Sequence, residues 1–147
     1  MSSTLTKIEI WPYCDLDRAG VVALWNEAFA DPRAHNLPDL VITRKMAVQR
    51  GLFFVALVDG RVVGTTMAGY DGVRGWLHRV AVSKSYRRQG IGRSLVEHAV
   101  RALKAMGCAK VNLQVRADHA EAEAFYASLG FGVEDRVSMG LTLKENV

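Results

Sequence analysis

The chain has 147 residues, of which 50% are apolar and 23% are charged, with 3 prolines and 13 glycines. This composition excludes intrinsic disorder and fibrous or low-complexity classes. A chain of this size buries roughly two-thirds of the surface that its unfolded form exposes, which is enough to fold without metal or disulfide. We therefore expect one globular domain over residues 1–147.

The N-terminus and the cysteines indicate a cytoplasmic protein. Residues 1–10 lack the basic region and apolar stretch of a signal peptide. The apolar run Leu52–Val58 is far shorter than the roughly 20 residues of a membrane-spanning helix, so no membrane contact is expected. Cys14 and Cys108 lie far apart without metal-ligand spacing, which favours free thiols and no bound metal.

The first third of the chain predicts one strand and two helices. Lys7–Trp11 has the length of a short strand, and Asp15 is the predicted N-cap of a helix that ends near Phe29. The apolar residues of that helix recur at three- and four-residue spacing, as in one buried stripe: Val21, Leu24, Trp25, Ala28 and Phe29. Residues 31–39 contain two prolines and predict a loop, and Leu40–Gln49 predicts a second, short helix.

The middle of the chain predicts a meander of three antiparallel strands. Leu52–Val58 is followed by Asp59-Gly60, a dipeptide typical of two-residue hairpin turns, and Arg61–Tyr70 pairs back on it. Asp71-Gly72 offers a second turn before the third strand, Gly75–Val82. Alternation places Trp76, His78, Val80 and Val82 on one face of this strand and Leu77, Arg79 and Ala81 on the other.

The last third predicts two helices and two further strands. Ile91–Met106 is an amphipathic helix closed by Gly107, and Lys110–Arg116 alternates as a strand. Ala120–Leu129 predicts a helix, and Val133–Leu143 a final strand or pair of strands. The order β-α-α-β-β-β-α-β-α-β indicates an α+β fold, with a mixed, mostly antiparallel sheet flanked by helices.

Positive charge gathers where the third meander strand meets the long helix. The net charge is +4, and six basic residues lie close together: Arg74, Arg79, Lys84, Arg87, Arg88 and Arg93. The first N–H groups of a helix have no partner inside it, and its dipole favours an anion there. Gly90 and Gly92 would let a bulky diphosphate approach the backbone. The segment therefore predicts a phosphate-binding turn, the alternative being a glycine-softened loop with a solvated basic face.

Two motifs in this chain resemble those of one family. The segment Val80–Gly92, with Arg87-x-x-Gly90-x-Gly92, resembles the acyl-CoA pyrophosphate loop of the GNAT superfamily of N-acyltransferases. Downstream, residues 119–131 resemble that family's Asn-x-x-Ala-x-x-Leu-Tyr-x-x-x-Gly-Phe segment, as His119-x-x-Ala122-x-x-Phe125-Tyr126-x-x-x-Gly130-Phe131. Their separation and the element order agree with the family over nearly the whole chain. Residues 67–75 are further similar to the small bacterial YpeA-like branch.

The resemblance implies acetyl-CoA as co-substrate. It places the pyrophosphate on backbone N–H groups from Arg88 to Gly92 beside the Arg87 side chain, and the pantetheine arm along Val80–Val82 as a pseudo-strand. The Val80 N–H is the candidate that polarises the thioester carbonyl. His119 stands where the family has asparagine, which leaves its hydrogen bond to pantetheine open. The implied cofactor-binding set is Val80, Ala81, Val82, Arg87, Arg88, Gln89, Gly90, Ile91, Gly92, Arg93 and His119.

The resemblance also implies candidates for proton transfer. Tyr126 occupies the family's general-acid position, from which its phenol would protonate the leaving CoA sulfur; the alternative is an aromatic packed beside Phe125. The position of the family's glutamate base is Trp76 in this chain. His78 shares the predicted face of Trp76 and is the candidate base, directly or through water, against the alternative of a structural or substrate-lining histidine.

The implied function is transfer of an acetyl group from acetyl-CoA to a primary amine, on a small molecule or a peptide, by direct attack in a ternary complex. One alternative is an acyl-CoA-binding module or sensor that has lost catalysis. The other is a nucleic-acid binder, which the absence of a recognisable nucleic-acid module disfavours. The acceptor and the oligomeric state, including a homodimer, stay open. Asp31, Asp39 and Asp71 could attract a cationic amine, and Trp25, Phe29, Met46 and Trp76 line either an acceptor pocket or the core.

Overall fold

The computed structural model describes residues 7–29 and 33–143. The chain divides into two compact units, Met1–Gln114 and Val115–Val147. Of the elements in these described residues, the larger unit holds the sheet and three α-helices, and the smaller holds one α-helix.

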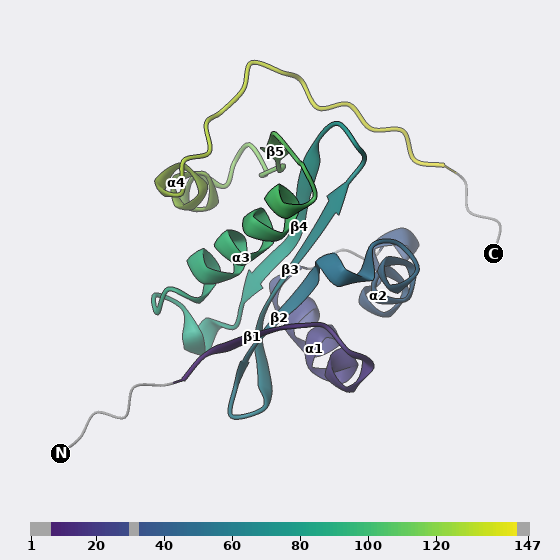
Figure 1. Cartoon of the computed structure of the whole chain (residues 1–147), viewed down its shortest axis with the longest axis vertical. Coiled ribbons are helices and arrows are strands. Elements are labelled where there is room, and N and C mark those ends of the chain that lie inside the picture. The colour runs from purple at the N-terminus through teal and green to yellow at the C-terminus, as the bar shows by residue number, and fades with distance from the viewer. Residues whose placement is uncertain (1–6, 30–32, 144–147) are drawn as a thin grey trace. The chain divides into compact units, whose positions relative to one another are not determined.

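The larger unit is built on a five-stranded sheet (Figure 1). Its strands are β1 (Glu9–Pro12), β2 (Phe53–Val58), β3 (Arg61–Tyr70), β4 (Gly75–Val82) and β5 (Val111–Asn112), in the order β1-β2-β3-β4-β5. Neighbouring strands from β1 to β4 are antiparallel, whereas β5 runs parallel to β4. The turn between β2 and β3 has Asp59 and Gly60 at φ 50° and 75°, as a two-residue hairpin requires. The predicted meander is therefore confirmed.

Helices cover both faces of this sheet (Figure 1). One face carries α1 (Arg18–Ala28) and α2 (Pro38–Met46), and the other carries α3 (Ile91–Ala105). Helix α1 begins three residues after the predicted cap, because Asp15–Asp17 form a 3₁₀ turn and the Asp15 carboxylate pairs with Arg18 at 3.1 Å. Helix α2 starts at Pro38, where the missing N–H of proline costs no helical hydrogen bond.

The core lies between the sheet and the helices on each face. The predicted stripe of α1 is confirmed, since Val21, Leu24 and Trp25 are buried. Burying each side chain of this size contributes roughly 1.5–3 kcal/mol relative to leaving it exposed. On the other face α3 buries a matching stripe of Ile91, Leu95, Val96, Ala99 and Leu103.

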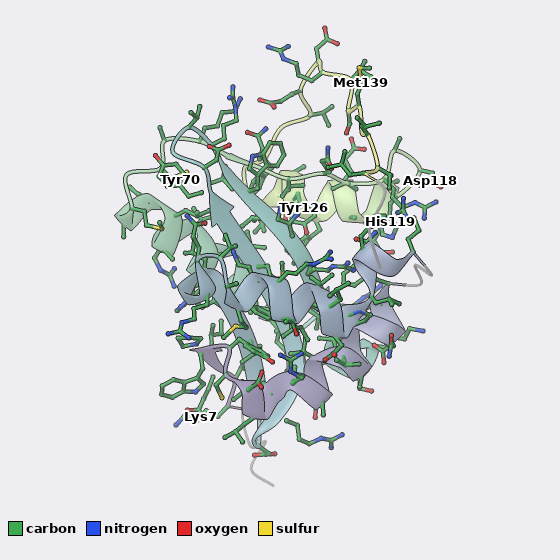
Figure 2. All side chains as sticks on the ribbon, turned by 90° about the vertical axis from the view of Figure 1, so that its right-hand side faces the viewer. Lys7, Tyr70, Asp118, His119, Tyr126 and Met139 are labelled. Carbon is green, nitrogen blue, oxygen red and sulfur yellow. The ribbon has the colours of Figure 1, made fainter. Side chains whose placement is uncertain are left out.

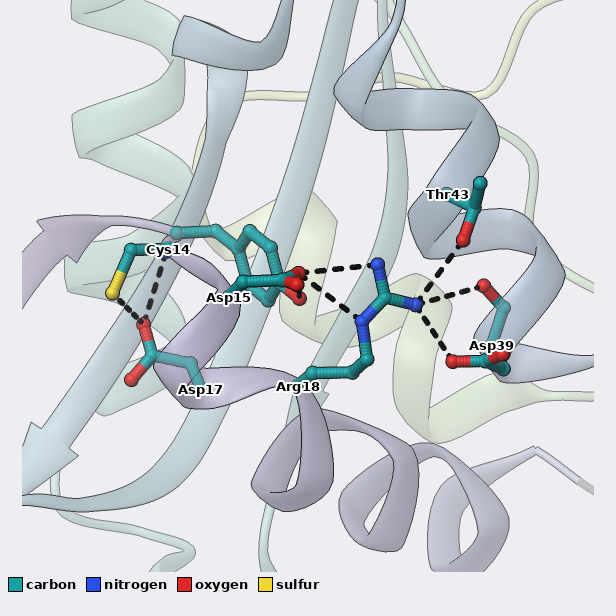
Figure 3. A network of polar contacts seen from close by, with 7 residues as sticks. Cys14, Asp15, Asp17, Arg18, Asp39 and Thr43 are labelled. Carbon is teal, nitrogen blue, oxygen red and sulfur yellow. Dashed lines mark hydrogen bonds and ion pairs between the residues drawn. The ribbon is translucent and has the colours of Figure 1, made fainter.

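Arg18 joins the starts of α1 and α2 (Figure 3). Its guanidinium donates to the Asp39 carboxylate at 2.6 Å and to the Thr43 hydroxyl at 3.2 Å, while it also pairs with Asp15. Because Asp39 and Thr43 both lie on α2, this one side chain orients the two helices over their face of the sheet.

The smaller unit contains α4 (Ala120–Ser128), and Gly130 follows it in the left-handed region at φ 98°. The predicted final strand is wrong, because the described part of Val133–Leu143 carries no strand assignment. The large apolar side chains of this segment are exposed, with Val137 at 87% and Met139 at 90%. Alternating apolar and polar residues suit the two faces of a strand, but a strand also needs the backbone of a neighbouring strand for its hydrogen bonds.

None of the helices in the described part of the chain is long and apolar enough to pass through a bilayer.

Candidate active site

Strand β4 has one edge that is paired over only part of its length. It pairs with β3 along almost its whole length, but with β5 only at Gly75 and Trp76. Among the described residues, no strand pairs with this side of β4 beyond Trp76. Ser83 N–H donates to the Val63 carbonyl at 2.8 Å, so alternation turns the main-chain groups of Val82 toward the open side.

The loop after β4 leads directly into the N-terminus of α3. Lys84–Tyr86 form a 3₁₀ turn, and Arg88 and Gly90 then take left-handed conformations at φ 63° and 80°. A Cβ on Gly90 would meet no atom within 4 Å, so the space beside this backbone is open. The N-cap of α3 is Gly90, which has no side chain to bond the first N–H groups of this helix.

Charged side chains surround the same loop. Lys84, Arg87 and Arg88 are exposed, and Arg93 pairs with Glu97 at 3.6 Å. The Arg87 guanidinium donates to the Val82 carbonyl at 3.4 Å. Glu27, on α1, accepts from the Lys84 N–H at 3.2 Å and so ties this helix to the beginning of the loop.

A bulge interrupts β4 just before the loop. Thr65 pairs with Ala81, but Met67 pairs with His78, so the register shifts between these two pairs. Arg79 lies inside the bulge at φ 53°, a conformation that costs a residue with a side chain roughly 1–2 kcal/mol. The predicted alternation is therefore wrong beyond His78: the Arg79 guanidinium lies 5.3 Å from the centre of the Trp25 ring, on the α1 face.

A buried chain of hydrogen bonds holds the bulge. The Trp25 indole N–H donates to the Thr65 hydroxyl, which donates to the Arg79 carbonyl, each at 2.8 Å. Thr65 is fully buried, so water cannot replace either bond. Trp25, a candidate for lining the acceptor pocket, is fully buried and belongs to the core.

His78 lies before the bulge and faces positive charge. Burial lowers its pKa below the usual 6.5, and the charges of Lys45 and Arg79 lower this pKa further. The neutral imidazole therefore predominates at pH 7. Lys45 is half-buried, donates to the Ala68 carbonyl of β3, and has its own pKa lowered by burial.

The smaller unit carries the second motif (Figure 2). His119 is the N-cap of α4, and its Nδ1 accepts from the Ala122 N–H at 3.1 Å. Tyr126 packs against Phe125 and Phe131, with ring centres 4.9 and 5.8 Å away. Burial raises the pKa of the Tyr126 phenol to about 12, so the phenol keeps its proton across the physiological range.

The structure brings the predicted residues together in two groups. His78 and the Val80–Arg93 segment form one continuous stretch of the larger unit, whereas His119 and Tyr126 belong to the smaller. The sequence analysis did not identify Lys45, Thr65 or Glu27 as part of a site. No local pattern marks them, because each acts on a segment far away in the chain.

The acidic residues proposed to attract a cationic amine include two that hydrogen bond within the chain. Asp39 is bound by Arg18, and the Asp71 carboxylate accepts from the N–H groups of Val73 and Arg74 in its own turn. These backbone hydrogen bonds lower the pKa of Asp71. Asp31 lies outside the described residues.

Comparisons with known proteins agree with this architecture. The sequence profile of the Acetyltransferase (GNAT) family matches residues 18–131. An acetyltransferase of Sodalis glossinidius is 37% identical over 130 residues, which cover 88% of this chain and 81% of that protein. The ribosomal-protein-S18-alanine N-acetyltransferase of Escherichia coli has a TM-score of 0.72 at 28% identity, over 86% of this chain and 78% of that one.

An aminoglycoside N-acetyltransferase, solved in complex with CoA, shares the fold with a TM-score of 0.78 at 16% identity, over 97% of this chain and 99% of that one. This chain has a five-stranded mixed sheet in which a basic loop joins the fourth strand to the N-terminus of α3. The chain belongs to the GNAT family of acetyltransferases.

Proposed function

We propose that this acetyltransferase moves the acetyl group of acetyl-CoA to a primary amine by direct attack in a ternary complex. The observation that carries the proposal is the open edge of β4, which pairs with β5 only at Gly75 and Trp76 and continues into the loop before α3. An extended pantetheine arm would add to such an edge as a strand, through main-chain hydrogen bonds.

The loop fits a diphosphate on three grounds. The N-cap of α3, the left-handed Gly90, has no side chain to bond the first N–H groups of the helix, and a Cβ on it would meet open space. Lys84, Arg87 and Arg88 add exposed positive charge nearby. In this proposal the N–H groups from Arg88 to Gly92 bind the pyrophosphate, with Gln89, Ile91 and Arg93 within the same segment.

The chemistry forms a bond from nitrogen to the acetyl carbon and breaks the bond from that carbon to sulfur. The Val80 N–H, at the bulge, donates to the thioester oxygen as negative charge develops there; loss of such a donor costs about 10²-fold or more in rate. His78, neutral at pH 7, takes the amine proton directly or through water. Tyr126 gives its proton to the leaving sulfur.

The second candidate is a module that binds acyl-CoA without turnover. One observation favours it: Trp76 stands at the family's glutamate position, and the remaining base candidate, His78, has a lowered pKa and is a weak base.

Release of CoA thiol from acetyl-CoA, measured with and without an amine panel, separates the two candidates. We expect release that depends on the amine, one acetylated product per thiol by mass spectrometry, and intersecting double-reciprocal plots, as a ternary complex requires. Tight binding of acetyl-CoA without amine-dependent release would establish the module instead. Parallel plots would indicate a covalent acetyl-enzyme and contradict direct attack.

A further inference from the structure

The α2-facing side of β3 and β4 carries basic groups around the predicted position of the acceptor. Lys45 extends from α2 to the Ala68 carbonyl, and Ala68 pairs with Leu77 of β4. His78 is the next residue of β4, and its pKa reports the nearby charges of Lys45 and Arg79. An acceptor amine bound near the bulge on this side would therefore lie in the positive field of these two side chains.

Lys45 carries its charge without an acidic partner. Its ammonium donates to a neutral carbonyl, and no carboxylate of residues 7–29 or 33–143 pairs with it. A half-buried ammonium is costly in this situation, since a neutral carbonyl replaces only part of its lost hydration. An anion from outside the chain would supply the missing countercharge.

Two of the three acidic side chains that would attract a cationic acceptor are engaged elsewhere, and the third, Asp31, lies outside the described residues. Asp39 binds Arg18 at 2.6 Å, and Asp71 closes its own turn through the N–H groups of Val73 and Arg74. At the position where the family has its glutamate base, this chain has Trp76, which is uncharged.

We propose that the acceptor amine also carries a negatively charged group, a carboxylate in the first instance, which pairs with Lys45. The proposal rests on the proposed function and names the substrate class of that site. Lys45 reaches the sheet level with Leu77, and the bulge at Val80 lies three residues further, roughly 10 Å at about 3.3 Å per residue. The carboxylate and the amine of the acceptor are therefore separated by a short chain rather than by a single carbon.

The same field assists the chemistry. Positive charge beside a bound amine lowers the pKa of that amine and raises its neutral, nucleophilic fraction at pH 7. The acceptor therefore needs less from a general base, which agrees with the tryptophan at the glutamate position. Polycationic acceptors experience the field as repulsion and are disfavoured.

The test uses three amines that share one reacting group and differ in charge at the far end: 6-aminohexanoate, 6-aminohexanamide and 1,6-diaminohexane. Amine-dependent thiol release gives kcat/KM for each. We expect 6-aminohexanoate to exceed the other two by roughly tenfold or more, as one charge-assisted contact allows, and the preference to shrink with added salt.

Variants of Lys45 assign the preference to this side chain. Lys45→Arg keeps the charge and should keep the preference, Lys45→Gln should abolish it, and Lys45→Glu should reverse it in favour of the diamine. Lys104→Glu makes the same charge change on the exposed end of α3 and should leave the order unchanged. Thermal unfolding of each variant monitors the contact with Ala68.

Two results overturn the inference while amine acetylation stands: equal kcat/KM for the three amines, or an equal loss for all three in Lys45→Glu, which would reduce Lys45 to a structural contact. Absence of thiol release with these probes and with a broad amine panel instead overturns the proposed function, and the inference with it.

Discussion

Gly90 provides a sharp test of the loop, because strain and ligand contact can be separated there. Gly90 and Gly107 lie just outside the two ends of α3 at φ 80° and 91°, and a Cβ on either would meet no atom within 4 Å. Alanine at each position therefore adds conformational strain without a clash. The strain is about 1–2 kcal/mol.

Both variants should lose similar stability, and only one should lose affinity. A loss of about 1 kcal/mol corresponds to a fall of roughly 2–4 °C in Tm for a chain of this size. In Gly90→Ala the added methyl also occupies the space beside the α3 N–H groups. Loss of one charged hydrogen bond, about 1.5–3 kcal/mol, would weaken acetyl-CoA binding roughly 10- to 100-fold.

Isothermal titration calorimetry with acetyl-CoA and thermal unfolding measure the two effects side by side. Gly107→Ala serves as the control, because it imposes the same strain at the other end of the same helix. Equal affinities of the two variants for acetyl-CoA would refute the assignment of this loop to the diphosphate.

Three further results are expected. Tyr126→Phe should lower kcat more than acetyl-CoA affinity, and an unchanged kcat in the variant would exclude the phenol as acid. Because the pKa of Tyr126 is raised to about 12, the wild-type kcat should show no loss from ionisation of this phenol up to about pH 10. Because the pKa of His78 is lowered below 6.5, both kcat/KM and stability should fall as the pH decreases through that lowered pKa. His78→Gln should remove this acidic limb of the two pH profiles. An acidic limb that persists in the variant would point to another titrating group. Thr65→Val leaves the indole N–H of Trp25 without its acceptor and should cost about 1–3 kcal/mol in urea unfolding, whereas Thr65→Ser should retain most of the stability; equal stabilities of the two variants would show that the hydrogen bond contributes little.

The meander and α3 could be predicted because their signals are local. Arg61–Tyr70 and Gly75–Val82 have the predicted bounds, since turn dipeptides delimit them and apolar runs fill them. Helix α3 starts at the predicted Ile91, immediately after a glycine. The bounds of an element could be predicted wherever residues adjacent in the sequence determine where it begins and ends.

Long-range pairing explains what could not be predicted. The bulge at Arg79 depends on Thr65 and Trp25, which meet it only in the folded chain. Residues 133–143 alternate as a strand would, but β-structure is decided by a partner that alternation does not reveal. The roles of Lys45 and Glu27 were missed for the same reason, because each contacts a segment that is distant in the sequence.

Gly75 is the first of the two β4 residues that pair with β5, and it lies close to α3. A Cβ there would lie 2.8 Å from the Cys108 sulfur and 3.0 Å from Leu103, so a larger residue would have to displace these side chains. Beyond these two paired residues the stretch Leu77–Val82 extends roughly 20 Å at about 3.3 Å per residue. In the proposed function, this stretch lies between the last pair with β5 and the loop before α3, and its length would set how far along the strand an acyl thioester is delivered.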